Sequence, residues 1–210
     1  MLKWEQHLIR KAYMATRIVF FDLETRKHAA DLSPDNDLGW DKLRAGEGGA
    51  SAIALYDTQT KWVHLYDDHS INAAARHLES ADVVVGFCSQ KFDVPVIEGI
   101  LGRALRLRFH YDIYIEMVRG HAERNIRTHP GDLKLDTICK RNLGRGKIEH
   151  GANAKTLASQ GRYGQLFNYC ADDVHLTYDL FLQLIKDGGL INTNGKFMSL
   201  PLPSWIKLET

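Results

Sequence analysis

Two acidic residues lie at the end of an apolar stretch in the segment FFDLET, residues 20–25. Asp22 and Glu24 are separated by one residue, so in a β-strand their side chains would project from the same face. Like charges this close repel one another unless a cation binds between them. The pair therefore predicts a metal site, whereas a single carboxylate such as Asp22 has the simpler interpretation of a turn cap or an ion-pair partner.

Two further acidic positions lie beside apolar residues and complete a set. Asp93 lies in GFCSQKFDVPVI, directly after the apolar segment DVVVGF, and Asp173 lies in NYCADDVHLTYDL. Tyr169 precedes Asp173 by four residues, so the two side chains would share one face of a helix, whereas Asp172 would point about 100° away. Cleaving a phosphodiester bond requires an activated water and positive charge around the phosphate, and two metal ions about 4 Å apart supply both. Mg²⁺ and Mn²⁺ prefer oxygen ligands, which four carboxylates provide.

The segments F-D-L-E-T, G-F-x-x-x-x-F-D and Y-C-x-D-D-V resemble the three exonuclease motifs of the DEDD superfamily of 3′–5′ exonucleases, which have the ribonuclease H-like fold. More narrowly, the chain resembles the ribonuclease H-like exonucleases predicted in bacteria and phages. The resemblance extends to GWDKL and LKLDTICKRNLG and covers approximately residues 17–202. It implies that Asp22, Glu24, Asp93 and Asp173 surround two divalent cations, either Mg²⁺ or Mn²⁺.

Position 169 decides the subclass that the resemblance implies. Members of the superfamily carry either a histidine five residues before the last aspartate or a tyrosine four residues before it, and here these positions are Asn168 and Tyr169. The chain is therefore similar to the tyrosine subclass, DEDDy, in which Tyr169 would orient the attacking water. A tyrosine with an ordinary pKa, near 10, is a poor base at neutral pH.

Several residues near these motifs are candidates for contacts with the nucleic acid. Tyrosine-type members often carry asparagine at the position of Cys88, and a thiol is a weak hydrogen-bond donor, so the resemblance implies a weaker grip on the strand there. Phe92 would either stack on a terminal base or belong to the core. The basic residues would either contact phosphates or form a solvated helix end. The candidates are Thr25, Cys88, Phe92, Arg141, Arg145 and Lys147.

Composition limits the class of protein. The 210 residues, 44% of them hydrophobic, predict one domain over residues 17–202, with an N-terminal extension, 1–16, and a C-terminal tail, 203–210. The net charge of +1 indicates no partner, but residues 94–168 hold 13 Lys and Arg against 7 Asp and Glu, which suits either a polyanion site or an ordinary solvated surface. Three separated cysteines without a CxxC pair favour the cytoplasm. No apolar run is long enough to cross a membrane, and the N-terminus lacks a signal-peptide core.

The apolar pattern predicts an α/β fold, a ribonuclease H-like mixed β-sheet flanked by helices in a single domain, because a hairpin comes early and later strands alternate with helices. Residues 26–49 are polar and rich in glycine, and we expect a long loop there. The expected strands are 17–23, 51–56, 61–66, 82–87 and 105–111, and the expected helices are 71–79, 92–101, 113–120, 133–143 and 164–186.

The leading functional hypothesis is a metal-dependent 3′–5′ exonuclease that acts on the 3′ ends of single-stranded DNA or RNA, with DNA favoured. Two alternatives stay open. One is a nucleic-acid-binding module that recruits an unidentified protein partner and has little or no nuclease activity. The other is a structure-specific endonuclease on the same fold.

Overall fold

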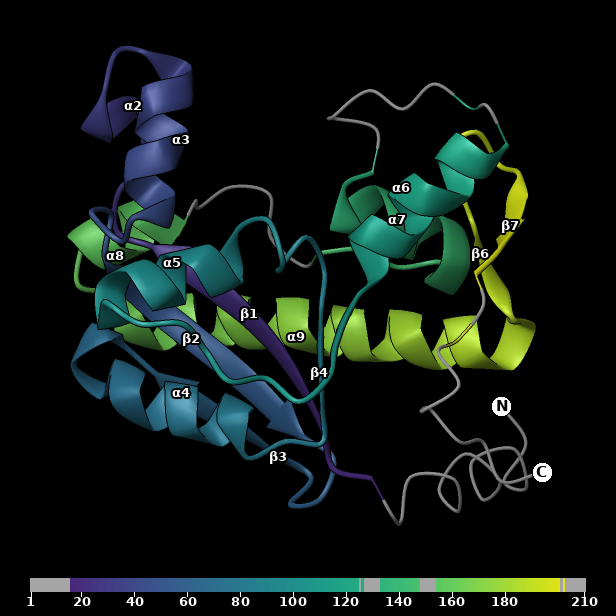
Figure 1. Ribbon diagram of the computed structural model, residues 1–210, viewed down its shortest axis with the longest axis horizontal. Helices are drawn as coiled ribbons and strands as arrows, with labels where there is room; N and C mark the ends of the chain where they lie inside the picture. The colour runs from purple at the N-terminus through teal and green to yellow at the C-terminus, as the bar shows by residue number, and fades with distance from the viewer. Residues whose placement is uncertain (1–15, 125, 127–132, 148–153, 201, 203–210) are drawn as a thin grey trace.

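The computed structural model describes residues 16–124, 126, 133–147, 154–200 and 202. At its centre lies a five-stranded sheet with the order β3-β2-β1-β4-β5 (Figure 1). The central strand β1 (Ile18–Thr25) is antiparallel to β2 (Ala50–Asp57) and parallel to β4 (Val83–Gly86). The outer strands are β3 (Trp62–Tyr66), which is antiparallel to β2, and β5 (His110–Asp112), which is parallel to β4. The predicted mixed sheet in a single α/β domain is confirmed.

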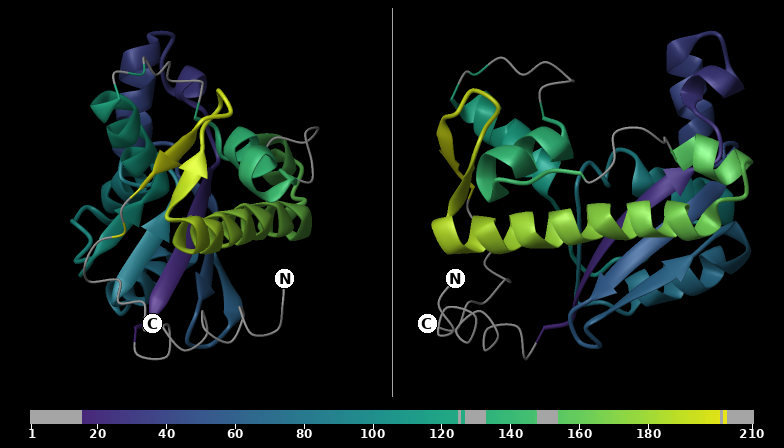
Figure 2. Two further views of the ribbon diagram at one scale, coloured as in Figure 1. Left: turned by 90° about the vertical axis from the view of Figure 1, so that its right-hand side faces the viewer. Right: turned by 180° about the vertical axis from the view of Figure 1, so that it is seen from behind.

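Strand β1 is central because its first four residues are apolar and buried, so both of its faces can be covered. Phe20 belongs to a core that includes the long helix α9 (Tyr163–Asp187). Phe21 faces the opposite way and belongs to a core with α4 (Ile71–Glu79) and α5 (Asp93–Leu101). Helices therefore cover both faces of the sheet, and the view from behind shows α9 crossing one of them (Figure 2).

Further elements gather at the two ends of α9. Helices α6 (Ile113–Glu123) and α7 (Leu135–Leu143) and a hairpin of β6 (Gly189–Ile191) and β7 (Phe197–Ser199) lie around its C-terminal half (Figure 1). The short helix α8 (Ala154–Ser159) precedes α9 and lies at its other end, near the end of β1 (Figure 1). Among the described helices, none has the length and apolar character needed to cross a membrane.

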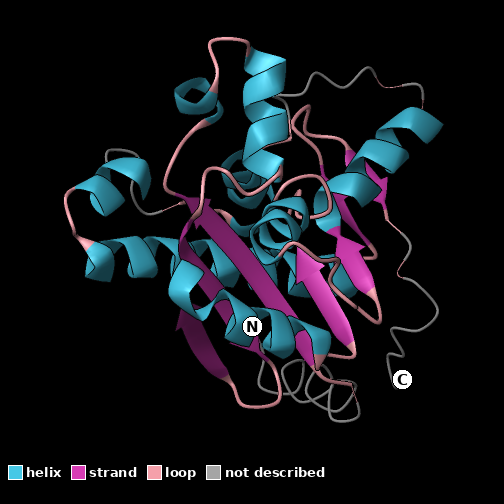
Figure 3. Ribbon diagram, turned by 60° about the vertical axis from the view of Figure 1, so that its left-hand side comes forward, coloured by secondary structure: helices cyan, strands magenta, loops and turns pink. Residues whose placement is uncertain are grey.

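The prediction of a long loop over residues 26–49 is wrong. This segment forms helices α2 (Ala29–Leu32) and α3 (Asn36–Arg44), which rise from the end of the sheet where β1 ends (Figure 3). Asp35 caps α3 by accepting a hydrogen bond from the Leu38 N–H at 3.1 Å. Gly39 lies inside α3, where a Cβ would come within 2.3 Å of the Ala29 carbonyl oxygen. This glycine therefore permits close packing of two helices and does not mark a loop.

Smaller departures concern short elements. The strand expected over 105–111 is limited to β5 at its end, and residues 105–109 are irregular. Helix α8, the β6–β7 hairpin and a 3₁₀ turn at Asp68–Ser70 were not expected, because elements this short carry too few apolar repeats to be detected. Apart from Thr16, the expected N-terminal extension and C-terminal tail lie outside the described residues, so the domain limits stay a prediction.

Candidate metal centre

Strand β1 presents two carboxylates to helix α9. Asp22 and Glu24 are partly buried and lie on the same face of β1 as Phe20, which contacts α9. On the neighbouring strand β2, the residues paired with Asp22 and Glu24 are Ala54 and Ala52. Because alanine side chains are small, the carboxylates have room between the sheet and the helix.

Helix α9 adds a third carboxylate to the pair. Asp173 is buried on the side of α9 that faces the sheet. One carboxylate oxygen from each of Asp22, Glu24 and Asp173 lies within 4.8 Å of the other two. The Cys170 Sγ lies 3.4 Å from the Asp22 carbonyl oxygen, so helix and strand are in direct contact here. Asp172, the neighbour of Asp173, is not part of this group.

Asp93 contacts β1 along the edge that pairs with β4, opposite the edge that pairs with β2. It is the first residue of α5, and its Oδ1 accepts a hydrogen bond from the Leu23 N–H at 2.9 Å. Pairing between β1 and β4 extends only as far as Phe20, so this amide of β1 is free to bind a side chain. Asp93 therefore lies next to Asp22 and Glu24 but outside the group of three oxygens.

Burial and mutual repulsion shift the protonation of all four carboxyl groups. Burial, followed by the charge of Asp173, raises the pKa of Asp22 well above its usual value and raises the pKa of Glu24 to about 8. Burial likewise raises the pKa of Asp93 to about 7, and the pKa of Asp173 is also raised by burial. Without a metal ion, the site therefore retains protons near neutral pH, as expected of buried carboxylates whose charge Lys147 compensates only in part.

A buried oxygen without a partner indicates what the site lacks. Within the described residues, Asp173 Oδ1 is buried and makes no hydrogen bond. Buried carboxylate oxygens are almost always hydrogen-bonded or bound to a cation. Oxygen-only donors at this spacing suit a hard divalent ion such as Mg²⁺ or Mn²⁺. The residues therefore fit the cations that the sequence resemblance implies.

Tyr169 and Lys147 lie beside Asp173. Tyr169 precedes Asp173 by four residues on α9, and its hydroxyl lies 3.3 Å from the Lys147 Nζ. Burial raises the pKa of Tyr169 above its usual value of 10.0. The Lys147 Nζ donates to Asp173 Oδ2 at 2.5 Å. The structure thus places Lys147, expected as a phosphate contact, directly on a carboxylate of the site.

Three of the other residues expected to contact nucleic acid instead form hydrogen bonds or an ion pair inside the protein. The Thr25 hydroxyl donates to the Lys27 carbonyl oxygen at 2.8 Å. Arg145 forms an ion pair with Asp179 on α9. Cys88 has a φ of 65°, a left-handed conformation, and its N–H donates to Asp112 Oδ1 at 2.9 Å. Asparagine adopts this conformation readily, which gives a backbone reason for the asparagine that tyrosine-type members often carry where this chain has Cys88.

The remaining two candidates are more accessible. Arg141 is exposed at the end of α7. Phe92 is partly buried, directly precedes Asp93 and lies edge-to-face against Trp40 of α3, with ring centroids 5.8 Å apart. Trp40 is 39% exposed. Sequence reasoning missed Trp40 as an individual residue, although the GWDKL segment that contains it was part of the resemblance.

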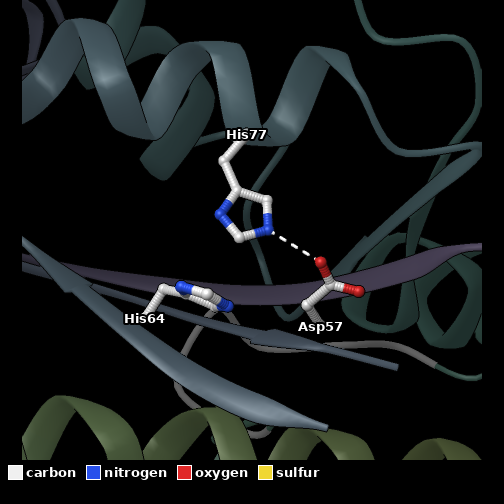
Figure 4. A group of neighbouring side chains, drawn as sticks. All are labelled: Asp57, His64 and His77. Atoms are coloured by element: carbon white, nitrogen blue, oxygen red, sulfur yellow. Dashed lines mark hydrogen bonds and ion pairs between the residues drawn. The ribbon is translucent and has the colours of Figure 1, made fainter. Parts of the chain in front are cut away.

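A second group of possible metal ligands, Asp57, His64 and His77, lies at the opposite end of β1 (Figure 4). Here Asp57 Oδ2 already accepts hydrogen bonds from the Arg17 Nε at 3.0 Å and Nη2 at 2.7 Å, and from the His77 Nε2 at 2.9 Å. Burial opposes the charged form of Asp57, but these hydrogen bonds outweigh it and lower the pKa of Asp57 to about 2. The charge is compensated by arginine, so this group is a structural ion pair, whereas in the group around Asp22 the Lys147 ammonium faces three carboxylates.

Comparison with known proteins supports the fold. No family model matches the chain, and no curated protein matches it in sequence. Among solved structures, it is similar to the family B DNA polymerase from the hyperthermophilic archaeon Pyrobaculum calidifontis, with a TM-score of 0.58 and 17% sequence identity. The alignment covers 81% of this chain and 24% of the polymerase chain, so the protein spans about a quarter of the protein it matches. At this identity the likeness shows the fold, a mixed sheet flanked by helices that is consistent with the ribonuclease H-like type.

Proposed function

We propose that this protein is a metal-dependent 3′–5′ exonuclease of the tyrosine subclass that acts on single-stranded nucleic acid. The observation that carries the proposal is that carboxylate oxygens of Asp22, Glu24 and Asp173 lie within 4.8 Å of one another. They come from strand β1 and helix α9, which are far apart in the sequence. The unpartnered Asp173 Oδ1 supports a cation there. DNA is the favoured substrate, because the structural neighbour is a DNA polymerase.

The carboxylates have distinct roles in this proposal. Asp22, Glu24 and Asp173 would hold the divalent ions directly, and Asp93, fixed by the Leu23 N–H, would hold the second ion through water. Two such ions supply positive charge to the attacked phosphate and lower the pKa of a water. Burial of Asp173 against β1 keeps bulk water away from its oxygens, which strengthens their interaction with positive charge.

Tyr169 would orient the attacking water through its hydroxyl. The hydroxyl lies on the same face of α9 as Asp173, one helical turn earlier. Because burial raises its pKa, the hydroxyl keeps its proton at neutral pH and acts as a hydrogen-bonding group, not as a base.

The aromatic pair Trp40 and Phe92 would receive the terminal base. The pair is partly exposed, and Phe92 is covalently adjacent to Asp93, so a base stacked on it would lie next to the carboxylates. Stacking on aromatic side chains is the usual way to bind single strands without sequence preference.

The test is a cleavage assay with Mn²⁺ on 5′-labelled and 3′-labelled single-stranded DNA and RNA. We expect stepwise shortening from the 3′ end by the wild type and loss of activity, by at least about a thousandfold, in Asp22→Asn and Asp173→Asn. Asp172→Asn is the matched control on the same helix and should retain activity.

Three outcomes would contradict the proposal. Activity of Asp22→Asn equal to that of the wild type would exclude the metal site as the catalytic centre. Cleavage of a circular single strand would indicate an endonuclease. Tight binding of single strands by a wild-type protein that cuts none of them would favour the recruitment module.

A further inference from the structure

Lys147 forms an ion pair with Asp173, one of the three carboxylates of the candidate metal centre. Its Nζ lies 2.5 Å from Asp173 Oδ2, and only a quarter of its side chain is exposed. Asp173 itself is almost completely buried. An ammonium group this close to a buried carboxylate compensates the same negative charge that a metal ion would bind, although it leaves Oδ1 without a partner among the described residues.

The segment that carries Lys147 is held at several points, so the position of the ammonium is built into the fold. The Lys147 N–H donates to Asp136 Oδ1 at 2.9 Å, at the start of α7. A Cβ on Gly146 would lie 2.2 Å from the same Asp136 oxygen, so a larger residue would push this side chain away. Arg145, one residue earlier, pairs with Asp179 of α9. Each contact fixes the backbone directly before Lys147.

Lys147 also has a second partner within reach. Its Nζ lies 3.3 Å from the Tyr169 hydroxyl and 5.2 Å from the centre of the Tyr169 ring. An aromatic ring attracts an ammonium group. The ammonium can therefore leave Asp173 without losing all of its interactions.

We propose that Lys147 is an exchangeable internal cation, which compensates Asp173 in the metal-free protein and competes with a divalent ion for this carboxylate. The inference rests on the metal site of the proposed function and goes beyond it. Its consequence is that Lys147 weakens metal binding, since an ion at Asp173 meets a charge that the ammonium already compensates and lies beside a second positive charge.

The test is a calorimetric titration of Mn²⁺ into the metal-free full chain. In Lys147→Met, which keeps the length of the side chain and removes its charge, Mn²⁺ should bind at least about tenfold more tightly than in the wild type. Lys147→Arg should stay close to the wild type. Lys155→Met is the matched control, because Lys155 pairs with Asp31 on the surface, and it should change the affinity less than about twofold.

Gly146→Ala provides a second variant that keeps every charge. Its Cβ would push the Asp136 carboxylate away and weaken the hydrogen bond that holds the Lys147 N–H, so Mn²⁺ should again bind more tightly than in the wild type. This variant tests the inference even where Lys147→Met fails to fold without metal. A cooperative thermal transition in chelator verifies the fold of each variant.

The titration also separates failure of the inference from failure of the proposed function. Equal Mn²⁺ uptake by wild type and Asp22→Asn would remove the metal site and the inference with it. Normal uptake by the wild type, its loss in Asp22→Asn, and unchanged or weaker affinity in folded Lys147→Met or Gly146→Ala would overturn the inference alone.

Discussion

Replacing Glu24 by glutamine should stabilise the metal-free protein, and the gain should grow as the pH rises. Burial, followed by the charge of Asp173, raises the pKa of Glu24 from 4.5 to about 8. Between these two pH values the folded protein holds a proton that the unfolded chain releases, so raising the pH favours unfolding. Glutamine has nearly the same shape and no charge, and it removes this dependence.

The size of the effect follows from the shift in pKa. A shift from 4.5 to about 8 corresponds to roughly 5 kcal/mol at a pH above both values. This is an upper limit, because Asp22 and Asp173 ionise more easily once Glu24 is neutral and because the positive charge of Lys147 is then less well compensated. We expect Glu24→Gln to gain about 2 to 3 kcal/mol in the free energy of unfolding at pH 8, and close to zero at pH 4.5.

The assay is urea unfolding in the presence of a chelator between pH 4.5 and 8.5. The wild type should lose stability relative to Glu24→Gln across this range. Glu47→Gln, at an exposed position of the segment after α3, controls for the loss of one negative charge. Parallel profiles for the wild type and Glu24→Gln would refute the conclusion that burial and the charge of Asp173 raise the pKa of Glu24 in the metal-free site.

Three further substitutions test individual residues of the site. Tyr169→Phe should lower kcat at least about tenfold while leaving Mn²⁺ affinity unchanged, and an unchanged kcat would exclude the water-orienting role. Trp40→Ala should raise KM for single-stranded DNA roughly 5- to 100-fold with little change in kcat, whereas an unaltered KM would exclude stacking. Cys88→Asn should stabilise the protein by about 1 kcal/mol in urea unfolding, because asparagine tolerates the φ of 65° at this position; a loss of stability would indicate that the thiol has a packing role.

Local patterns in the sequence are sufficient to predict the central strand of the sheet and several of its helices. The apolar residues before Asp22 indicate a strand buried on both faces, and the helix expected at residues 71–79 has the same bounds in the structure. The carboxylate pair of β1 was predictable for the same reason, because alternation along a strand is a local property. Asp93 and Asp173 are recognisable as acidic residues beside apolar segments, and the resemblance implies that they share a metal site with this pair.

Contacts between distant segments were not predictable from these patterns. The ion pair of Lys147 with Asp173 depends on how the segment after α7 lies against α9, and 26 residues separate the two positions. The contact of Trp40 with Phe92 depends on helix α3, and the glycines of residues 26–49 favour a loop there, although Gly39 serves close packing against α2. In both cases the sequence contains the residue, but its role depends on tertiary packing.

The most direct test of the metal centre is anomalous diffraction from crystals of the wild-type protein soaked in Mn²⁺. We expect a manganese peak among the oxygens of Asp22, Glu24 and Asp173 and no such peak in Asp22→Asn crystals. Absence of manganese at these carboxylates in the wild type, with or without a peak beside Asp57, His64 and His77, would contradict the proposed site.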